Sequence, residues 1–230
     1  MSEIIIVGGG AAGMMAAIAA ADQGHQVTIL EKNEKLGKKV FITGKGRCNI
    51  TNDSDVENLL QHTIRNPRFL YSAFYTFDSS RMMEFLESEG LRIKTERGNR
   101  VFPQSDHSSD VIRTLEKAMK KRGVTVRLHT RVLEIIVQDG RCSGIVAQKT
   151  EGGTKEMLSA DAVIAATGGV SYPSTGSTGD GLRFAKELGH RIVDVMPSLV
   201  PFEIREDFCR KMQGLSLKNV RVSISNGKKQ

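Results

Sequence analysis

Short apolar runs alternate with helical patterns along most of this chain, and the first three form one unit. Ile4–Val7 and Gln26–Leu30 are rich in β-branched residues and are typical of buried parallel strands. Met14–Ala21, rich in Ala and Met, predicts a helix between them. We therefore expect the chain to begin with a strand–helix–strand unit.

The middle of the chain carries further helical patterns and a hairpin signal. Ser108 to Asp110 begins an amphipathic helix, and Gly123 ends it. The other predicted elements here are helices at Asn66–Phe77 and Ser79–Glu89, a hairpin of Leu91–Lys94 with Arg100–Phe102, and a strand at Val124–Leu128.

Three β segments joined by tight turns follow. Val132–Gln138 leads into Asp139-Gly140, a strong hairpin signal, and Cys142–Lys149 and Thr154–Leu158 complete a three-stranded meander. Ala162–Ala166 has the composition of a fully buried strand. The pattern predicts an α/β fold, a Rossmann-like domain with a β-meander.

Glycines after the first strand have the spacing of a phosphate-binding turn. Gly8, Gly10 and Gly13 form G-x-G-x-x-G directly before the predicted helix. In such a turn the first glycine makes the bend, the second lets a pyrophosphate approach, and the third lets the helix pack on the strand. The helix N-terminus then favours phosphate. We expect a dinucleotide here.

An acidic residue ends the second strand. Glu31 lies 23 residues after Gly8, close to the spacing at which a carboxylate binds a ribose hydroxyl. Its charge would repel a ribose 2′-phosphate, which argues against NADP at this site. FAD and NAD both remain.

One stretch also has the length of a membrane span. Ile4–Ala21 is uncharged for 18 residues. It contains four glycines and starts without a basic lead or a signal-peptide pattern. A buried strand and helix explain it better, so we expect a soluble protein without a membrane partner.

Composition changes this picture little. The 230 residues are 39% hydrophobic and 26% charged, enough for one large domain. Cys48, Cys142 and Cys209 are far apart and the five histidines are scattered, so we expect no metal site and a reducing cytoplasm. The net charge of +7 is dispersed, without an aromatic-interleaved basic motif, so we do not expect nucleic acid as a partner.

Four segments give the chain a family resemblance: G-K-G-R-C-N-I-T-N at Gly44–Asn52, Ala166–Gly181, Val101–Pro103 and Pro197–Pro201. With the meander, they resemble the FAD-binding domain of glutathione-reductase-like flavoproteins. Within that group the chain is similar to bacterial NAD(P)/FAD-dependent oxidoreductases that include aminoacetone oxidases and a bile-acid dehydro-reductase. The resemblance covers most of residues 3–205 and implies FAD rather than NAD at the glycine turn.

The resemblance implies an extended FAD, with the adenosine ribose at Glu31 and the flavin near Arg47–Asn52 and Thr175–Asp180. The expected cofactor contacts are Gly8, Gly10, Ala11, Ala12, Gly13, Met14, Glu31, Lys32, Lys39, Gly46, Arg47, Cys48, Asn49, Thr51, Asn52, Val132, Thr167, Gly168, Gly169, Thr178, Gly179 and Asp180.

Three side chains are weak candidates for a catalytic part. Arg47 either stabilises negative charge on reduced flavin or forms an ion pair that holds its loop. Cys48 has no partner at redox spacing, which favours an inert buried thiol. His107 is of a residue type that often acts as a general acid or base, but it precedes a helix, which favours a capping role. Asp180 precedes the predicted helix Leu182–Leu188, where capping explains it structurally.

We place a domain boundary near residue 194. Residues 1–194 are expected to form the FAD-binding domain, and residues 195–230 the beginning of an incomplete β-rich substrate domain. Val220–Gly227 is its predicted first strand, ending at an Asn-Gly turn. We expect the chain to be the N-terminal part of a longer protein, which a native mass near 25.2 kDa would contradict.

The predicted function is that of an FAD-dependent oxidoreductase. It would pass a hydride or electrons between a small organic substrate and oxygen or diffusing NAD(P)H through flavin N5. Two alternatives stay open. One is an FAD-dependent RNA-modifying protein, suggested by the charge of +7. The other is a non-catalytic flavin-binding or redox-sensing module.

Overall fold

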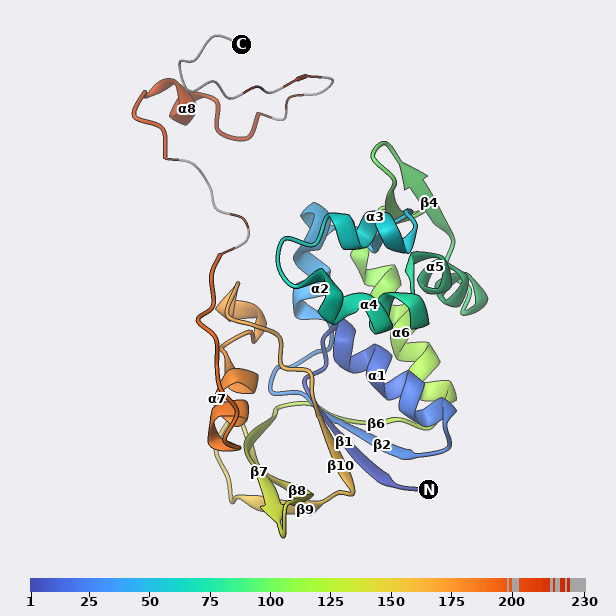
Figure 1. Ribbon diagram of the computed structural model, residues 1–230, viewed down its shortest axis with the longest axis vertical. Coiled ribbons are helices and arrows are strands. Elements are labelled where there is room, and N and C mark those ends of the chain that lie inside the picture. Colours follow the sequence, from blue (N-terminus) through green and yellow to red (C-terminus); the bar gives the residue numbers. More distant parts are fainter. Residues whose placement is uncertain (198, 200–202, 216, 218–219, 222, 224–230) are drawn as a thin grey trace. The chain divides into compact units, whose positions relative to one another are not determined.

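The computed structural model describes residues 1–197, 199, 203–215, 217, 220–221 and 223. The chain divides into two compact units, Met1–Ile192 and Val193–Gln230. The first contains the predicted strand–helix–strand start (Figure 1).

A four-stranded parallel sheet forms the centre of residues 1–192. Its strands are β1 (Glu3–Val7), β2 (Gln26–Leu30), β6 (Thr125–Arg127) and β10 (Ala162–Ala165), in the order β10-β1-β2-β6. Strand β1 pairs with both β2 and β10, so that Ile5 lies opposite Thr28 on one side and Val163 on the other. The predicted Rossmann-like α/β class is confirmed.

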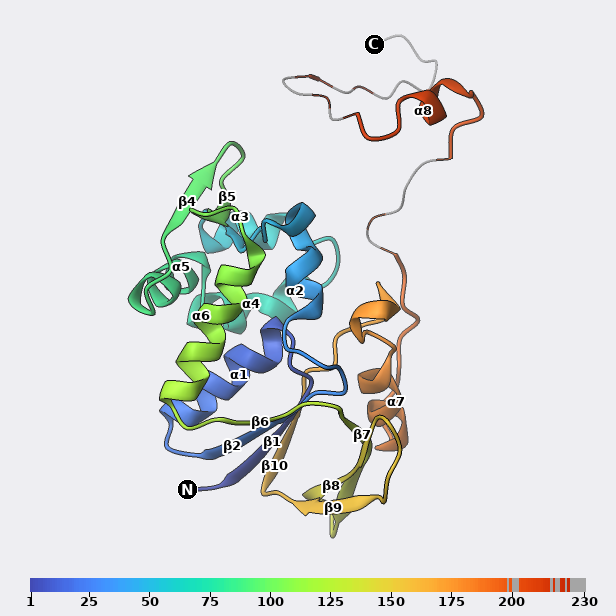
Figure 2. The same cartoon turned by 180° about the vertical axis from the view of Figure 1, so that it is seen from behind.

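Different layers cover the two faces of this sheet (Figure 2). Helices α1 (Ala11–Asp22) and α6 (Ser108–Lys121) pack on one face. The other face carries the antiparallel meander of β7 (Thr130–Gln138), β8 (Arg141–Lys149) and β9 (Glu156–Ser159). The predicted meander is therefore confirmed.

Successive side chains of β1 point to opposite faces of the sheet and contribute to a hydrophobic core on each face. Ile6 joins Met14 and Ala17 of α1 in the helix-side core. Ile5 and Val7 point the other way and join the meander-side core. Burial on both faces explains why the sequence of β1 is continuously apolar.

Strand β10 differs from its prediction. Ala162–Ala166 was expected to be fully buried, but Ile164 is 36% exposed and Ala165 is exposed as well. Within the described residues β10 is an edge strand, paired with β1 on one side, so its outer half is less covered.

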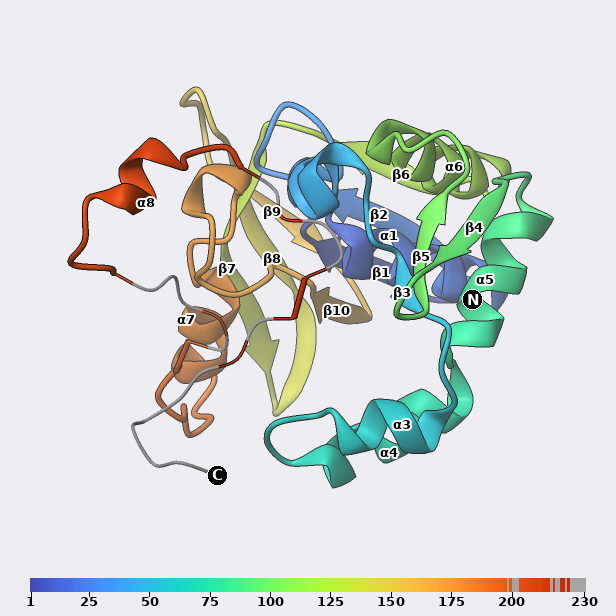
Figure 3. The same ribbon diagram turned by 90° about the horizontal axis from the view of Figure 1, so that it is seen from above.

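The part of the chain between β2 and α6 in the sequence forms a helical region with a small sheet (Figure 3). Its elements are α2 (Lys38–Ile42), the 3₁₀ turn η1 (Thr43–Gly46), β3 (Thr51–Asn52), α3 (Val56–Gln61), α4 (Pro67–Thr76), α5 (Ser79–Ser88), β4 (Ile93–Glu96) and β5 (Arg100–Pro103). Two predicted helices and the hairpin are confirmed, and Asp78 caps α5 by accepting from the Arg81 amide at 2.9 Å. The four short elements before α4 were not predicted.

The last elements are short. The 3₁₀ turn η2 (Pro173–Thr175) precedes α7 (Asp180–Glu187), and α8 (Phe208–Lys211) belongs to the second unit. Most of the predicted strand Val220–Gly227 lies outside the described residues, so it stays a prediction, as does the domain assignment. No described helix has the length and apolar character needed to cross a membrane.

Candidate functional site

Two glycines fit the end of β1 closely against its neighbours. Gly8 has a φ of +108°, and a Cβ there would lie 2.6 Å from the carbonyl oxygen of Ala166. A Cβ on Gly13 would lie 1.9 Å from the carbonyl oxygen of Gly8. Both positions therefore require glycine, and the predicted bend and helix packing are confirmed. A Cβ on Gly10 would meet no protein atom within 4 Å, which leaves room for a ligand.

Helix α1 starts at this turn without a side-chain cap. Gly10 is its N-cap and forms no side-chain cap, and the first turn contains no acidic residue. The first amides of a helix have no partner within it. Ala11 and Ala12 line a cavity, so this end of α1 is suited to an anion such as a phosphate.

Glu31 is a buried acceptor beside the turn, with 7% of its surface exposed. Its Oε2 accepts from the Gly9 amide at 2.6 Å. Its Oε1 accepts from the backbone and side-chain amides of Asn33 at 2.8 and 2.7 Å. These donors compensate the burial of the charge. A carboxylate has about four acceptor positions, so one remains for a hydroxyl in the cavity.

The cavity has a volume of about 560 Å³, within the range of small-molecule sites. It lies at the carboxyl ends of β1, β2 and β10, where α/β sheets commonly bind ligands. Beyond the glycine turn its wall includes Cys48–Ile50 and apolar side chains of α5 and α6, namely Met82, Leu86, Val111 and Leu115.

The cavity brings together a large part of the expected cofactor contacts. Those in its wall are Gly8, Gly10, Ala11, Ala12, Glu31, Lys32, Lys39, Cys48, Asn49, Val132, Thr167, Gly168 and Asp180. Those outside its wall are Gly13, Met14, Gly46, Arg47, Thr51, Asn52, Gly169, Thr178 and Gly179. Met14 instead belongs to the helix-side core.

Arg47 is held by two carboxylates. Its Nη2 lies 2.5 Å from Glu96 Oε1 and 2.6 Å from Asp106 Oδ1, and its guanidinium lies 4.1 Å from the Phe102 ring centre. Hydrogen bonding to Arg47 lowers the pKa of Glu96, and Lys94 together with Arg47 lowers that of Asp106. These contacts support the alternative in which Arg47 holds its loop.

Cys48 faces the cavity as a buried thiol, with 6% exposure. Burial raises its pKa above the usual 9.0, although a hydrogen bond with Thr43 acts in the opposite direction. The thiol is therefore protonated at neutral pH, as an inert cysteine would be.

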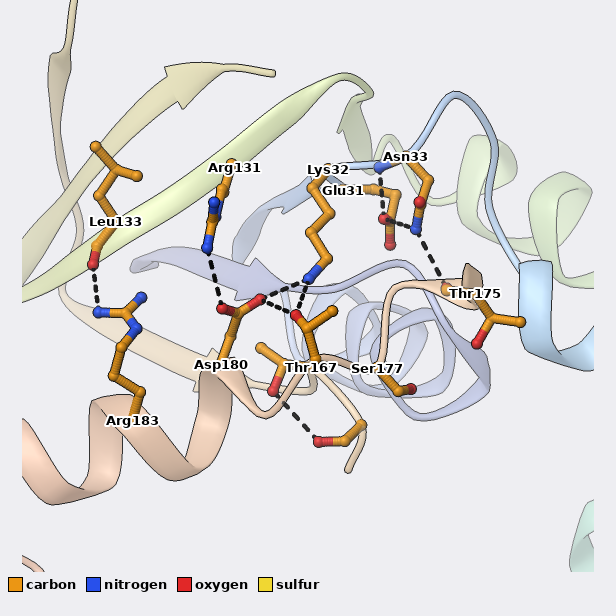
Figure 4. A network of polar contacts seen from close by, with 12 residues as sticks. Glu31, Lys32, Asn33, Arg131, Leu133, Thr167, Thr175, Ser177, Asp180 and Arg183 are labelled. Atoms are coloured by element: carbon orange, nitrogen blue, oxygen red, sulfur yellow. Dashed lines mark hydrogen bonds and ion pairs between the residues drawn. The ribbon is translucent and has the colours of Figure 1, made fainter. Parts of the chain in front are cut away.

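The two predicted capping side chains do not cap. His107 occupies the N-cap position of α6, but its exposed side chain makes no cap bond and does not line the cavity. The N-cap of α7 is Gly179, so the capping explanation for Asp180 was wrong. The Asp180 carboxylate instead accepts from Lys32 Nζ at 2.6 Å (Figure 4).

Side chains that follow β2 hold the segment 168–180 at the cavity (Figure 4). Lys32 Nζ donates to Asp180 Oδ2 and to Thr178 Oγ1, both at 2.6 Å. Lys39 Nζ donates to Ser177 Oγ at 2.6 Å and to the Ser171 carbonyl at 2.7 Å. Asn33 Nδ2 donates to the Thr175 carbonyl at 3.3 Å.

Several wall residues were not predicted from the sequence. Asn33 carried a local signal, because a polar side chain two residues after the acid can reach it. Met82 and Leu86 carried none, since helical periodicity does not distinguish a core residue from a cavity wall. Arg131, beside the predicted Val132, was also missed.

These parts fit an extended dinucleotide. The uncapped N-terminus of α1 and the open space at Gly10 suit a pyrophosphate, and Glu31 has an acceptor position for a ribose. The apolar wall at Met82 and Leu86 suits a flat ring system. Within the described residues no cluster of His, Cys, Asp or Glu could hold a metal ion.

Comparisons with known proteins agree with this fold. Residues 2–228 match the family described as "HI0933-like protein Rossmann domain". The chain is 36% identical over 217 residues to a 3-dehydro-bile acid delta(4,6)-reductase of Clostridium scindens, covering 94% of this chain and 51% of that protein. It is 29% identical over 222 residues to a ribosomal RNA dihydrouridine synthase of Haemophilus influenzae, covering 94% and 53%.

Among solved structures, the open conformation of a flavocytochrome c3 fumarate reductase superposes with a TM-score of 0.65. The two sequences are 26% identical, and the match covers 82% of this chain and 40% of that one. The chain spans about half the length of the curated relatives above. It belongs to the HI0933-like family of FAD-binding Rossmann domains.

Proposed function

We propose that the full-length protein is an FAD-dependent oxidoreductase that reduces a carbon–carbon double bond conjugated with a carbonyl group. Reducing equivalents would come from diffusing NAD(P)H, and oxygen would be an alternative acceptor. FAD supplies the hydride-transfer chemistry, through its N5 atom. The names of the relatives support this class, because a delta(4,6)-reductase, a dihydrouridine synthase and a fumarate reductase each saturate such a bond.

The residues of this chain would bind and orient the cofactor. Glu31 would accept a hydrogen bond from the adenosine ribose, and the amides of Ala11 and Ala12 would bind the pyrophosphate. The flavin would extend toward Cys48–Ile50, where apolar side chains exclude water from the reacting ring.

The observation that carries this proposal is the composition of the cavity wall. It joins an anion-binding helix end and a ribose acceptor to an apolar compartment. Arg47 is engaged by Glu96 and Asp106, and the Cys48 thiol is kept protonated. Neither side chain supplies a free acid or nucleophile, which fits a reaction whose chemistry belongs to the cofactor.

Anaerobic spectroscopy on the purified full-length protein tests the proposal. Mixing with NADH and with NADPH should bleach the flavin band with at least one donor. Adding fumarate, a 3-oxo-Δ4 steroid or uridine-containing RNA should then restore it with at least one acceptor. Succinate, which lacks the double bond, is the matched control. Reoxidation by oxygen but by none of these acceptors would contradict the proposed reaction class.

A second candidate is the FAD-dependent modification of RNA, which the ribosomal RNA dihydrouridine synthases among the relatives favour. The net charge of +7 agrees with an anionic partner. Ribosomal RNA from cells lacking the gene should then lose a dihydrouridine, measured by mass spectrometry, and the purified protein with NAD(P)H should restore it. Unchanged dihydrouridine content in the deletion strain would exclude this candidate.

A further inference from the structure

The segment 168–180 has few supports of its own. Before α7 begins at Asp180, its regular structure is the single 3₁₀ turn Pro173–Thr175, and Gly176 and Gly179 have φ values of +101° and +82°. Residues 168–174 are exposed. Two residues of the segment are buried, Ser177 with 6% and Asp180 with 9% of their surface exposed.

Lysines from the other side of the cavity contact both of these buried residues. Lys39 Nζ donates to Ser177 Oγ at 2.6 Å, and Lys32 Nζ donates to Asp180 Oδ2 at 2.6 Å. All four residues line the cavity. Both buried residues of the segment are therefore points of attachment across the cavity.

A third contact links the same segment to the ribose acceptor. Asn33 Nδ2 donates to Glu31 Oε1 at 2.7 Å and to the Thr175 carbonyl at 3.3 Å. The segment passes so close that a Cβ on Gly176 would lie 2.5 Å from Asn33 Nδ2. A displacement of the segment would disturb the amide that orients Glu31.

The charge of Lys32 is already neutralised within the protein. Its side chain is 22% exposed and that of Asp180 is 11% exposed, so the pair is partly desolvated. Burial is the largest single influence and would raise the pKa of Asp180, but Lys32, Thr178 and Arg131 together outweigh it, so the pKa is lowered. Arg131 Nη2, 3.6 Å from Asp180 Oδ1, adds a second cation. The carboxylate thus stays ionised and keeps Lys32 in place.

We propose that Lys32 and Lys39 are positioning residues that fasten the segment 168–180 over the FAD cavity and so set the rate at which FAD leaves, rather than ligands of its phosphates. This rests on FAD binding at this cavity. FAD leaves when the segment detaches, and each lysine contact removed makes detachment more frequent.

FAD release from the full-length holoprotein tests this, measured as the rise in free-flavin fluorescence after the holoprotein is diluted far below its dissociation constant for FAD. Lys32→Met and Asp180→Asn should each release FAD about tenfold faster, since a hydrogen bond between charged groups is lost. The effect of the double variant on the release rate should be less than additive, because both substitutions remove the same Lys32–Asp180 contact. The effects of Lys39→Met and Lys32→Met on the rate of FAD release should be additive when the two are combined, because the two contacts are separate.

Hydrogen exchange of residues 169–179 in the FAD-loaded protein is the second measurement. Faster exchange in Lys32→Met and Asp180→Asn should accompany faster release. Thr178→Val, which removes a hydroxyl bonded to Lys32 at 2.6 Å, is a milder variant with a smaller effect in the same direction. Arg183→Met is the matched control, because it removes a cation from α7 that contacts Glu187 and the Leu133 carbonyl outside the cavity wall.

Three results would overturn the proposal. The first is wild-type release from both Lys32→Met and Asp180→Asn. The second is full additivity between them, which would mean that Lys32 binds FAD directly. The third is faster release without any change in the exchange of residues 169–179. Bleaching of wild-type flavin by NAD(P)H is measured separately, so a failure here leaves the proposed reaction class unaffected.

Discussion

The glycine turn and the segment 168–180 face the same cavity but are built differently. The turn is made of backbone, and its acceptor Glu31 lies only 22 residues from Gly9, whose amide it binds. The segment is fastened by side chains, with Lys32 and Asp180 separated by 148 residues and Lys39 and Ser177 by 138.

Because of this difference, the glycine turn can form independently of the contacts that hold the segment 168–180 at the cavity. Gly8 and Gly13 are fixed by contacts to backbone atoms, so the turn forms when β1 packs against α1 and against the chain that follows β10. The segment depends on polar contacts that can break and form again while the sheet stays intact. Variants of the turn should therefore affect folding, and variants of the segment should affect cofactor exchange.

The largest effect is expected at Gly13. Gly13→Ala places a Cβ 1.9 Å from the Gly8 carbonyl oxygen, so α1 must move away from β1. We expect a loss of about 2–3 kcal/mol in the free energy of unfolding, by analogy with overpacked cores, and loss of FAD. Gly10→Ala is the matched control, since its Cβ meets no protein atom within 4 Å. It should keep the melting temperature of the apoprotein and weaken FAD binding alone. Equal destabilisation by both variants would contradict the assigned roles.

Glu31→Gln should act mainly on the cofactor. The amide cannot accept from Gly9 and Asn33 at once without directing its NH₂ group at a donor. We expect FAD affinity to fall about 10- to 100-fold, as for loss of hydrogen bonds to a charged group. Titration calorimetry with FAD measures this. Glu34→Gln is the control, because Glu34 is exposed and contacts Lys38 outside the ribose acceptor. Unchanged affinity in Glu31→Gln would exclude Glu31 as the ribose acceptor.

A smaller effect is expected at the Arg47 cluster. Arg47→Met should lower the melting temperature by only a few degrees, because the ion pairs are partly solvated. The pKa values of Glu96 and Asp106 are below their usual 4.5 and 3.8 in the folded protein. Their contribution is therefore complete above these usual values and is lost as the pH falls through the lowered ones. The gap between wild type and Arg47→Met should close on acidification, and a gap independent of pH would contradict the ion-pair role.

Substitution of Cys48 should have the smallest effect on flavin content and turnover. Because burial raises its pKa, the thiol stays protonated, and iodoacetamide should leave it unmodified at pH 7 in the folded holoprotein. Cys48→Ser should retain full flavin content and turnover. Loss of turnover with intact flavin content in this variant would restore Cys48 as a catalytic thiol.

Local patterns made the glycine turn predictable. Gly8, Gly13 and Glu31 lie within one strand–helix–strand unit, so spacing alone indicated their arrangement. The meander followed in the same way from short turns between apolar runs. The contact of Gly13 with Gly8 and the pairing of the meander strands are supplied by the adjacent chain, whereas the contact of Gly8 with Ala166 is not.

Side-chain contacts between residues far apart in the sequence could not be predicted from the sequence. Both interpretations of Arg47 stayed open because its partners, Glu96 and Asp106, lie 49 and 59 residues away. Asp180 has a residue type suited to capping, but its carboxylate contacts Lys32 instead. The apolar wall at Met82 and Leu86 escaped prediction because a helix facing a cavity has the same periodicity as one facing a core.

Identification of the released cofactor is the most direct test of the whole account. The full-length protein is purified, denatured and separated from its bound cofactor, which is identified by chromatography and mass. We predict one FAD per chain, retained by wild type and lost by Gly13→Ala. A different nucleotide, or no FAD even after incubation with excess FAD, would contradict the account.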